Sequence, residues 1–235
     1  MRTISLGCTA LDNLLHGGIP NGEITMLYGE AATGKTTTAI QAAYVAAMDG
    51  LKVLFIDCDN SFTHQRFNQI GGKESKAISE QIMLFFPDNF EEQRTLVESL
   101  DNYLTPTVGL VIIDSISTLY RAEFQDRDIF NLNRDLTGQL AYLANLTLSR
   151  DITCLITSQV RAQVKDVESS DRTMKTEPVA RRALLHFPRT IIRIRNQPRQ
   201  RVREFILERF KGNNVEVHCL VELGERGFVN VSQPF

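Results

Sequence analysis

One short stretch, residues 29–36, constrains the fold of this chain more than any other. It reads G-E-A-A-T-G-K-T and fits the pattern G-x-x-x-x-G-K-[ST] at every position. Glycines at the fixed positions let the backbone wrap closely around an anion, so that its N–H groups point at phosphate oxygens. A helix that leaves such a loop presents its N-terminus, with unpaired N–H groups, to the same anion. The stretch therefore predicts a strand–loop–helix unit that binds a nucleoside triphosphate.

The flanking residues support this interpretation over a chance glycine-rich turn. Residues 23–28 (E-I-T-M-L-Y) predict the strand that enters the loop, and residues 37–48 predict an Ala-rich helix that leaves it. Lys35 would place a point charge at the β- and γ-phosphates, and Thr36 would offer its hydroxyl to Mg²⁺. We expect ATP and Mg²⁺ as cofactors, with the nucleotide held by Gly29, Glu30, Ala31, Ala32, Thr33, Gly34, Lys35, Thr36 and Thr37.

Length and composition set modest limits on the class of protein. A chain of 235 residues suits one α/β domain. No apolar run is long enough to span a bilayer, and the N-terminal residues lack a signal-peptide pattern, so we expect no membrane partner and a cytoplasmic location. The 4 cysteines are far apart and form no C-x-x-C pair, which favours reduced thiols over a disulfide framework or structural zinc.

Apolar strands alternate with helical segments along most of the chain. This order predicts an α/β fold with a mostly parallel central sheet flanked by helices. Beyond Gln159 the pattern changes. Residues 162–178 are polar with no clear period and predict a loop, whereas residues 189–231 alternate with period two and predict antiparallel strands at the C-terminal edge of the sheet. We expect strands at 23–28, 52–57, 81–86, 109–114 and 152–158, and helices at 37–48, 62–70, 90–104 and 129–149.

Three polar residues follow the predicted strands and are candidates for chemistry. Asp114 ends an apolar strand, where P-loop enzymes place a carboxylate that holds Mg²⁺ opposite the hydroxyl of Thr36. Asp59 could orient or activate the attacking water, although Asp57 and Asp59 could instead cap the helix that follows. Gln159 could contact the γ-phosphate and pass its presence to the loop beyond, or it could be an ordinary polar residue at a strand end. We assign Lys35, Asp59 and Gln159 to catalysis, and Thr36 and Asp114 to the metal.

Basic residues are concentrated in one segment. Residues 161–211 hold 14 Lys/Arg against 6 Asp/Glu, although the whole chain has a formal charge of −2. A segregated excess of this kind favours a polyanionic partner such as DNA. The alternative is a solvated hairpin whose charged edges prevent aggregation. In the densest part, alternation places arginines on two neighbouring strands, where their guanidinium groups could follow a phosphate backbone; these are Arg193, Arg195, Arg199, Arg201 and Arg203.

Three further stretches extend the pattern beyond the phosphate-binding loop. Residues 4–25 (I-S-L-G-C-T-A-L-D-N-L-L-H-G-G-I-P-N-G-E-I-T) lead into the first strand, and residues 114–124 (D-S-I-S-T-L-Y-R-A-E-F) follow the candidate metal-binding Asp. Residues 156–164 (I-T-S-Q-V-R-A-Q-V) carry Gln159 into the polar loop. Together with the phosphate-binding loop, these stretches resemble the RecA-like recombinases of the archaeal and eukaryotic branch, and within it an archaeal paralogue of the main recombinase.

The resemblance covers nearly the whole chain and implies roles for individual residues. It implies a single RecA-like ATPase domain over residues 1–235. Asp59 falls where the family has its catalytic Glu, and Arg66 where a side chain stacks on adenine. The stretches after Asp114 and Gln159 resemble the first and second DNA-binding loops of the family, which adds Arg121, Arg127, Arg161 and Lys165 to the candidate DNA contacts.

Departures from the family pattern are equally informative. Asp59 is one methylene shorter than Glu, and because a displacement of about 1 Å can cost on the order of a hundredfold in rate, we expect feeble ATP hydrolysis. The chain begins at the ATPase core, so we expect neither the N-terminal helical DNA-binding domain of the family nor the linker with the Phe-x-x-Ala hook that joins protomers into filaments. These features favour an accessory, mediator-type protein that binds ATP and single-stranded or branched DNA. By the resemblance, its partners would be the main RadA-type recombinase and a Holliday-junction nuclease.

Two other function classes stay open from the sequence. One is a DNA-stimulated recombinase ATPase that carries out strand exchange itself. The other is a KaiC-like RecA-fold ATPase that acts on protein partners, with the arginine-rich hairpin as a protein interface.

Overall fold

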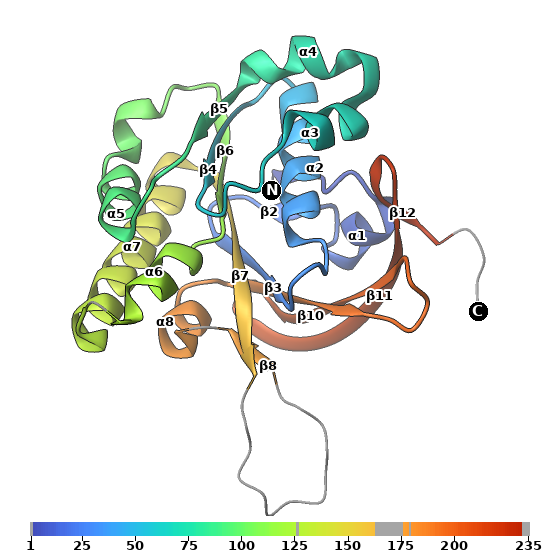
Figure 1. The fold of residues 1–235 in the computed structure, drawn as a ribbon. Coiled ribbons are helices and arrows are strands. Elements are labelled where there is room, and N and C mark those ends of the chain that lie inside the picture. The colour runs from blue at the N-terminus through green and yellow to red at the C-terminus, as the bar shows by residue number, and fades with distance from the viewer. Residues whose placement is uncertain (1, 126, 163–175, 179, 232–235) are drawn as a thin grey trace, which may run out of the picture.

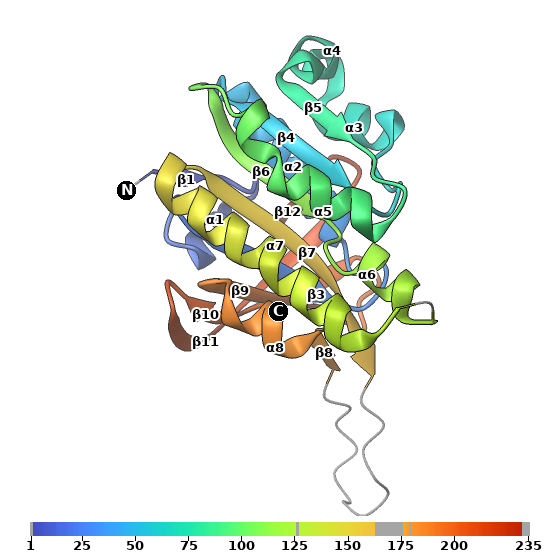
Figure 2. The same cartoon turned by 90° about the vertical axis from the view of Figure 1, so that its left-hand side faces the viewer.

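A ten-stranded mixed sheet runs through the molecule, with helices on both of its faces (Figures 1 and 2). The computed structural model describes residues 2–125, 127–162, 176–178 and 180–231. In sheet order the strands are β12 (Gly227–Asn230), β11 (Asn213–Gly224), β10 (Val202–Phe210), β9 (Thr190–Asn196), β3 (Ile24–Gly29), β7 (Thr153–Ala162), β6 (Val108–Asp114), β4 (Lys52–Asp57) and β5 (Ile82–Phe85), and β8 (Thr176–Pro178) pairs with β7 outside this path. A separate pair is formed by β1 (Thr3–Ile4) and β2 (Ile19–Pro20).

The strand directions confirm the predicted fold class. From β9 to β5 the neighbouring strands are parallel, whereas β10, β11 and β12 pair antiparallel at the C-terminal edge. Strands β3 and β6 are buried at every position, as expected for central strands covered on both faces. Because β9 pairs with β3, the C-terminal hairpins lie directly beside the strand that leads into the phosphate-binding loop.

Two helical layers cover the sheet, and each encloses its own hydrophobic core. Helix α2 packs closely on the sheet because its buried face consists largely of alanine, including Ala39, Ala43 and Ala46. One core includes residues of α1 (Thr9–Leu14), α2 (Lys35–Met48), α3 (His64–Gly71) and α4 (Ser75–Ile78), and the other includes residues of α5 (Phe90–Glu98), α6 (Thr118–Ala122), α7 (Ile129–Arg150) and α8 (Arg181–His186).

Two helices have boundaries that differ from the predicted ones. Helix α3 begins two residues later than expected, because the hydroxyl of Thr63 accepts a hydrogen bond from the backbone N–H of Arg66 and caps the helix. Helix α5 ends at Glu98, and a 3₁₀ turn over Leu100–Tyr103 replaces the rest of the predicted helix.

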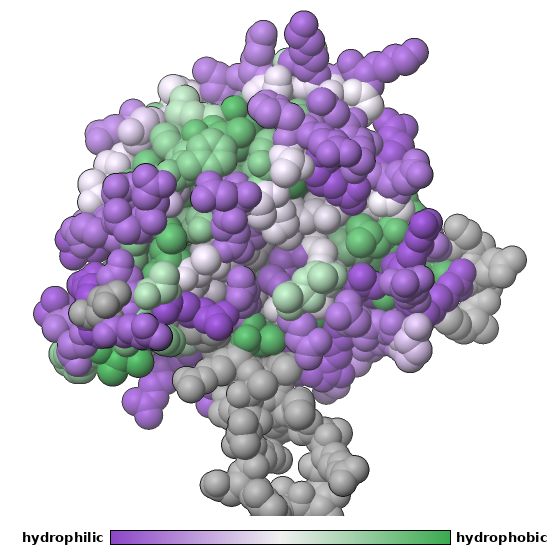
Figure 3. Space-filling view, in the orientation of Figure 1, coloured by the Kyte–Doolittle hydropathy of each residue, from purple (hydrophilic) through white to green (hydrophobic). Residues whose placement is uncertain are grey.

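Hydrophobic side chains are exposed at the edge of the sheet formed by β5, and also on α7, where Ile129, Phe130 and Leu148 are more than half exposed. Figure 3 shows hydrophobic side chains gathered over this strand on an otherwise largely hydrophilic face. Met83 and Phe86 are about half exposed, at 48% and 49%. Among the described residues, β5 pairs only with β4, so its other edge carries no neighbouring strand. No helix in the described part of the chain is long and apolar enough to cross a membrane.

The 4 cysteines are free thiols, as the sequence predicted. Cys8, Cys58 and Cys154 are buried, and burial raises the pKa of the Cys154 thiol to about 12. The thiolate, which is the reactive form, is therefore suppressed at this position.

Candidate functional site

The candidate site lies at the carboxyl ends of neighbouring parallel strands, where open α/β sheets place their ligands. Strand β3 ends at Gly29, and β7 places Gln159 directly opposite it in register. Strands β4 and β6 end with Asp57 and Asp114, which are also register partners. The motifs predicted separately from the sequence therefore meet at one edge of the sheet.

The phosphate-binding loop has a backbone shape that only glycine allows at two positions. A Cβ atom on Gly29 would lie 2.4 Å from the carbonyl oxygen of Ile194 on β9. Gly34 has φ of 101°, and a Cβ atom there would lie 2.5 Å from the Phe228 ring. Gly34 is also the N-cap of α2, and no side chain caps that end of the helix. The amide groups at this N-terminus are thus open to an anion such as phosphate.

The side chain of Lys35 is held by backbone carbonyl groups of the phosphate-binding loop, residues 29–36. Its side chain is buried, and its Nζ donates to the carbonyl oxygens of Gly29 at 3.0 Å and Glu30 at 2.7 Å. Burial lowers the pKa of the ammonium group, and the nearby carboxylates of Asp114 and Asp59 oppose that shift. The charge is therefore fixed at the mouth of the loop and only partly compensated, as a phosphate-binding site requires.

Asp114 has the surroundings of a cation ligand. It is buried, it accepts hydrogen bonds from the hydroxyls of Thr157 and Ser61, and Thr36 lies beside it. Burial raises the pKa of this carboxyl group, while the hydroxyls of Thr157 and Thr36 counteract the shift. A hard cation coordinated by oxygen would stabilise the ionised carboxylate. The carboxylate of Asp114 and the hydroxyl of Thr36 are therefore ligands of the kind that Mg²⁺ prefers.

Asp57 and Asp59 make different contacts, and neither is the N-cap of the helix that follows. Asp57 is fully buried and accepts the backbone N–H groups of Asp59, Ser61 and Phe62 at 3.2, 3.1 and 2.7 Å. It thereby shapes the loop after β4. The carboxylate of Asp59 is left to line the pocket, and the cap of α3 is Thr63 rather than either aspartate.

Gln159 contacts a candidate DNA-binding residue. Its side-chain oxygen accepts a hydrogen bond from Arg121 Nη1 at 2.7 Å, and its backbone N–H donates to Ser117 Oγ at 3.3 Å. The carboxamide lines the pocket as well. Gln159 is therefore placed between the candidate phosphate site and α6, which begins the stretch that resembles a DNA-binding loop.

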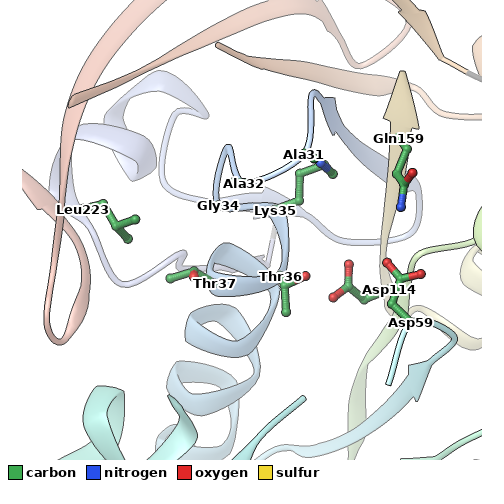
Figure 4. A pocket seen from close by; sticks show the side chains of 10 residues that line it. All are labelled: Ala31, Ala32, Gly34, Lys35, Thr36, Thr37, Asp59, Asp114, Gln159 and Leu223. Atoms are coloured by element: carbon green, nitrogen blue, oxygen red, sulfur yellow. The ribbon is translucent and has the colours of Figure 1, made fainter. Parts of the chain in front are cut away.

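The pocket has a polar end and an apolar end. Its volume is about 320 Å³, within the lower range of small-molecule sites. Figure 4 shows Gln159, Asp114 and Asp59 on one side of Lys35 and Leu223 on the opposite side. An elongated ligand with a charged end and an apolar end would be oriented by this difference. The residues that line the pocket are Ala31, Ala32, Gly34, Lys35, Thr36, Thr37, Asp59, Asp114, Gln159 and Leu223.

Leu223 was not predicted from the sequence, because no local motif marks it. It belongs to β11, and the fold brings it to the pocket through the turn between β11 and β12. Arg66, the predicted adenine-stacking residue, is not among the residues that line the pocket. Its Nη1 instead donates to the carbonyl oxygen of Glu225 in the same turn, at 2.8 Å.

The arginine-rich hairpin exists, but its arginines do not form one row. Antiparallel partners point to the same face of a sheet, and Glu204 pairs with Arg195 while Arg203 pairs with Asn196. Arg203 therefore lies on the face opposite to Arg193 and Arg195, which corrects the expectation that all five could follow one phosphate backbone. Arg193 is also mostly buried and lies 3.6 Å from Glu208.

The remaining basic candidates are placed as follows. Arg195, Arg199 and Arg201 are exposed, the last two on the turn between β9 and β10. Arg127 donates to Asp135 at 2.8 Å and is engaged in the interior of the α6–α7 region. Lys165 and the side chain of Arg161 lie outside the described residues, as does most of the predicted polar loop.

Comparison with known proteins gives a consistent result over nearly the whole chain. The Rad51 family model matches residues 1–229. The "DNA repair and recombination protein RadB" of Methanococcoides burtonii is 35% identical over 188 residues, which cover 80% of each chain. The protein of the same name from Thermococcus gammatolerans is 32% identical over 232 residues, covering 97% of this chain and 99% of that one. A solved structure described as the crystal structure of the RadB recombinase superimposes with a TM-score of 0.80 at 28% identity, covering 98% of this chain and 100% of the other.

Proposed function

The chain belongs to the Rad51 family, among relatives named RadB, and on that basis we propose that it is an ATP- and DNA-binding accessory protein of homologous recombination and DNA repair. Its action would be that of a mediator in the cytoplasm, assisting a RadA-type recombinase. We propose that it hydrolyses ATP slowly and does not carry out strand exchange itself.

The observation that carries the proposal is the convergence of Lys35, Thr36 and Asp114 on one pocket (Figure 4). Lys35 would hold the β- and γ-phosphates, and the backbone N–H groups of the loop would surround them. Thr36 and Asp114 would hold Mg²⁺, which supplies charge neutralisation on the phosphates when it is bound. Leu223 at the apolar end supports an orientation in which the nucleoside lies on that side.

Slow hydrolysis is proposed from the length of a single side chain. Asp59 is the carboxylate that remains free to position water, because Asp57 is committed to three backbone N–H groups. A carboxylate that is one methylene too short holds water away from the in-line position, and misplacement of this size is expensive in rate. Gln159 would sense the γ-phosphate from the other side of the site.

DNA would bind at two places near the nucleotide. Arg199 and Arg201 on the β9–β10 turn are exposed cations of the kind that contact phosphates. The segments that follow Asp114 and Gln159, with Arg121 nearest to the pocket, would supply the other contacts. Single-stranded or branched DNA is the proposed substrate.

The edge of β5 that is unpaired among the described residues is a candidate surface for binding a protein partner. Strand β5 has an edge without a neighbour among the described residues, and Met83 and Phe86 expose apolar surface there. Such an edge is suited to pairing with a strand from another chain. We propose that the main RadA-type recombinase uses this surface; a Holliday-junction nuclease is a second candidate partner.

A DNA-binding titration across salt, with and without ATP, tests the proposal. We expect log affinity to fall against log salt by about 0.7 to 0.9 per phosphate neutralised, and ATP to strengthen binding. Lys35→Ala serves as the control that removes the ATP effect. DNA affinity that does not respond to salt would favour a RecA-fold ATPase that acts on proteins. Fast hydrolysis on single-stranded DNA, with filaments visible by electron microscopy, would instead identify a strand-exchange recombinase.

A further inference from the structure

Arg203 connects the phosphate-binding loop to the basic turn between β9 and β10. Its Nη1 donates to the carbonyl oxygens of Gln200 in the turn and of Val202 at the start of β10, both at 3.0 Å. Its Nη2 lies 3.4 Å from the carbonyl oxygen of Ala32 at the tip of the phosphate-binding loop. One guanidinium group thus touches the segment that carries Arg199 and Arg201 and the loop that would hold the phosphates.

The rest of the phosphate-binding loop is packed tightly against the same C-terminal strands. Gly29 abuts the carbonyl oxygen of Ile194, and Gly34 abuts the ring of Phe228, which in turn packs on Phe205. Backbone contacts this close leave little freedom at the two ends of the loop. Ala32 lies between them with φ of 59°, and Arg203 is the side chain that meets its carbonyl group.

The contact between Arg203 and the Ala32 carbonyl group affects the N–H of Thr33, which belongs to the same peptide. The carbonyl group of Ala32 and the N–H of Thr33 belong to one peptide, and N–H groups of this loop are the ones that face phosphate. A cation on the carbonyl oxygen polarises the peptide and strengthens its N–H as a donor, because hydrogen bonds in a chain reinforce one another. Phosphate on the N–H would strengthen the contact with Arg203 for the same reason.

The guanidinium geometry also leaves part of Arg203 unsatisfied. Its Nε is buried and has no hydrogen-bond partner among the described residues. A buried donor without a partner costs stability. A role in stability alone therefore explains Arg203 poorly. A side chain without a buried Nε donor would avoid the free-energy cost of leaving that donor unpaired.

We propose that Arg203 is a positioning residue that couples nucleotide binding at the phosphate-binding loop to DNA binding at the turn over residues 197–201. The inference rests on the proposed function, in that it assumes both ligands. Coupling of this kind is reciprocal: ATP raises the affinity for DNA by a certain factor, and DNA raises the affinity for ATP by the same factor.

The test is a complete binding cycle on the wild-type protein and two variants, Arg203→Lys and Arg203→Gln. DNA affinity is measured with and without a nonhydrolysable ATP analogue and Mg²⁺, and affinity for the analogue is measured with and without DNA. Lysine keeps the positive charge but lacks the planar fork that reaches the carbonyl groups of Gln200, Val202 and Ala32 together, and glutamine is shorter and uncharged. We expect a coupling factor of roughly five or more in the wild type, and a factor within about twofold of one in both variants.

Arg201→Ala is the matched control, because it removes a charge from the same turn without touching Ala32. It should weaken DNA binding equally with and without nucleotide and leave the coupling factor at its wild-type value. Thermal unfolding verifies that each variant is folded. A wild-type coupling factor in folded Arg203→Lys and Arg203→Gln would overturn the inference while leaving the proposed DNA and ATP binding intact.

Hydrogen–deuterium exchange of residues 196–203 tests the same connection without DNA. The ATP analogue should slow exchange of these amides in the wild type and have no effect on them in Arg203→Lys. If the protein binds no DNA, the proposed function and the coupling to DNA both fail, and the exchange result then decides only whether Arg203 transmits nucleotide binding to this turn. An unchanged exchange rate in the wild type would overturn it, even if both variants failed to fold.

Discussion

Replacing Asp59 with glutamate should make the protein a faster ATPase. The carboxylate of Asp59 lines the pocket, and its backbone N–H, not its side chain, is what the buried Asp57 holds. The longer side chain therefore enters the site without dismantling the loop after β4. We expect Asp59→Glu to bring the carboxylate about 1 Å closer to the attacking water and leave ATP affinity unchanged.

The size of the gain follows from the sensitivity of rate to position. A misplacement of about 1 Å can cost on the order of a hundredfold, which corresponds to about 2.7 kcal/mol in activation free energy. That value is an upper limit, because the residues that line the pocket surround an aspartate at this position and the longer glutamate must fit among them. An increase in kcat of about threefold to a hundredfold, at constant KM, is the expected result.

The assay is steady-state phosphate release at saturating ATP and Mg²⁺, alongside equilibrium binding of a labelled analogue. Asp59→Asn is the matched control and should lower the rate further, because it keeps the size of the side chain and removes its basicity. Asp57→Asn should reduce thermal stability instead, since three backbone N–H groups lose a charged acceptor. Equal or lower turnover in Asp59→Glu with intact ATP affinity would refute the idea that the length of Asp59 limits hydrolysis.

Three further variants probe the loop and the turn. Lys35→Ala should weaken ATP binding by roughly tenfold to a hundredfold, which is the value of a lost charge-assisted hydrogen bond. Thermal stability should change little. Unchanged affinity for a labelled ATP analogue would contradict the assignment of this loop as the ATP site. The double variant Arg199→Ala with Arg201→Ala should make the salt slope of DNA binding shallower by about one to two units, without changing base preference. An unaltered slope would leave the two loops as the DNA contacts. Gly34→Ala should lower the free energy of unfolding by about 1 to 3 kcal/mol, measured by chemical denaturation, because it combines a positive φ with a Cβ atom 2.5 Å from the Phe228 ring. A denaturation midpoint equal to that of the wild type would show that the ring moves aside freely.

The elements of the fold that were predictable are those set by local pattern. Buried strands such as β3 and β6 read as continuous apolar runs, and the long helix α7 shows an amphipathic period, so their positions were predicted closely. Residues at the carboxyl ends of parallel strands must meet at one edge of the sheet. The phosphate-loop pattern and the strand-end positions therefore allowed Lys35, Asp114 and Gln159 to be predicted as neighbours, and all three line the pocket.

The contributions of the C-terminal strands could not be predicted in the same way. Period-two alternation shows that β9 to β12 are strands, but it does not show that β9 lies parallel to β3. That pairing places Ile194, Arg203 and Phe228 around the phosphate-binding loop and brings Leu223 to the pocket. No sequence signal near these residues marks such a placement, because it depends on which strand is neighbour to which.

A count of charges also cannot separate free cations from paired ones. Arg193 contributed to the basic excess of residues 161–211, yet it is paired with Glu208 at 3.6 Å; Arg127, a candidate by the family resemblance, is likewise paired with Asp135. Arg195 and Arg201, by contrast, are exposed. The basic segment is real, but the part of it that is free to meet a polyanion is smaller than the sequence suggested.

Two arginines that the sequence assigned to DNA contact residues that line the candidate nucleotide pocket. Arg121 reaches Gln159 on β7, and Arg203 reaches Ala32 in the phosphate-binding loop. If ATP binds as proposed, both contacts would depend on the bound triphosphate rather than on its hydrolysis, since Gln159 and Ala32 both line the pocket. If the proposed mediator function holds, the short side chain of Asp59 would therefore cost the protein little. Occupancy of the pocket by ATP alone could set the affinity for DNA, and slow hydrolysis would then prolong the DNA-binding state.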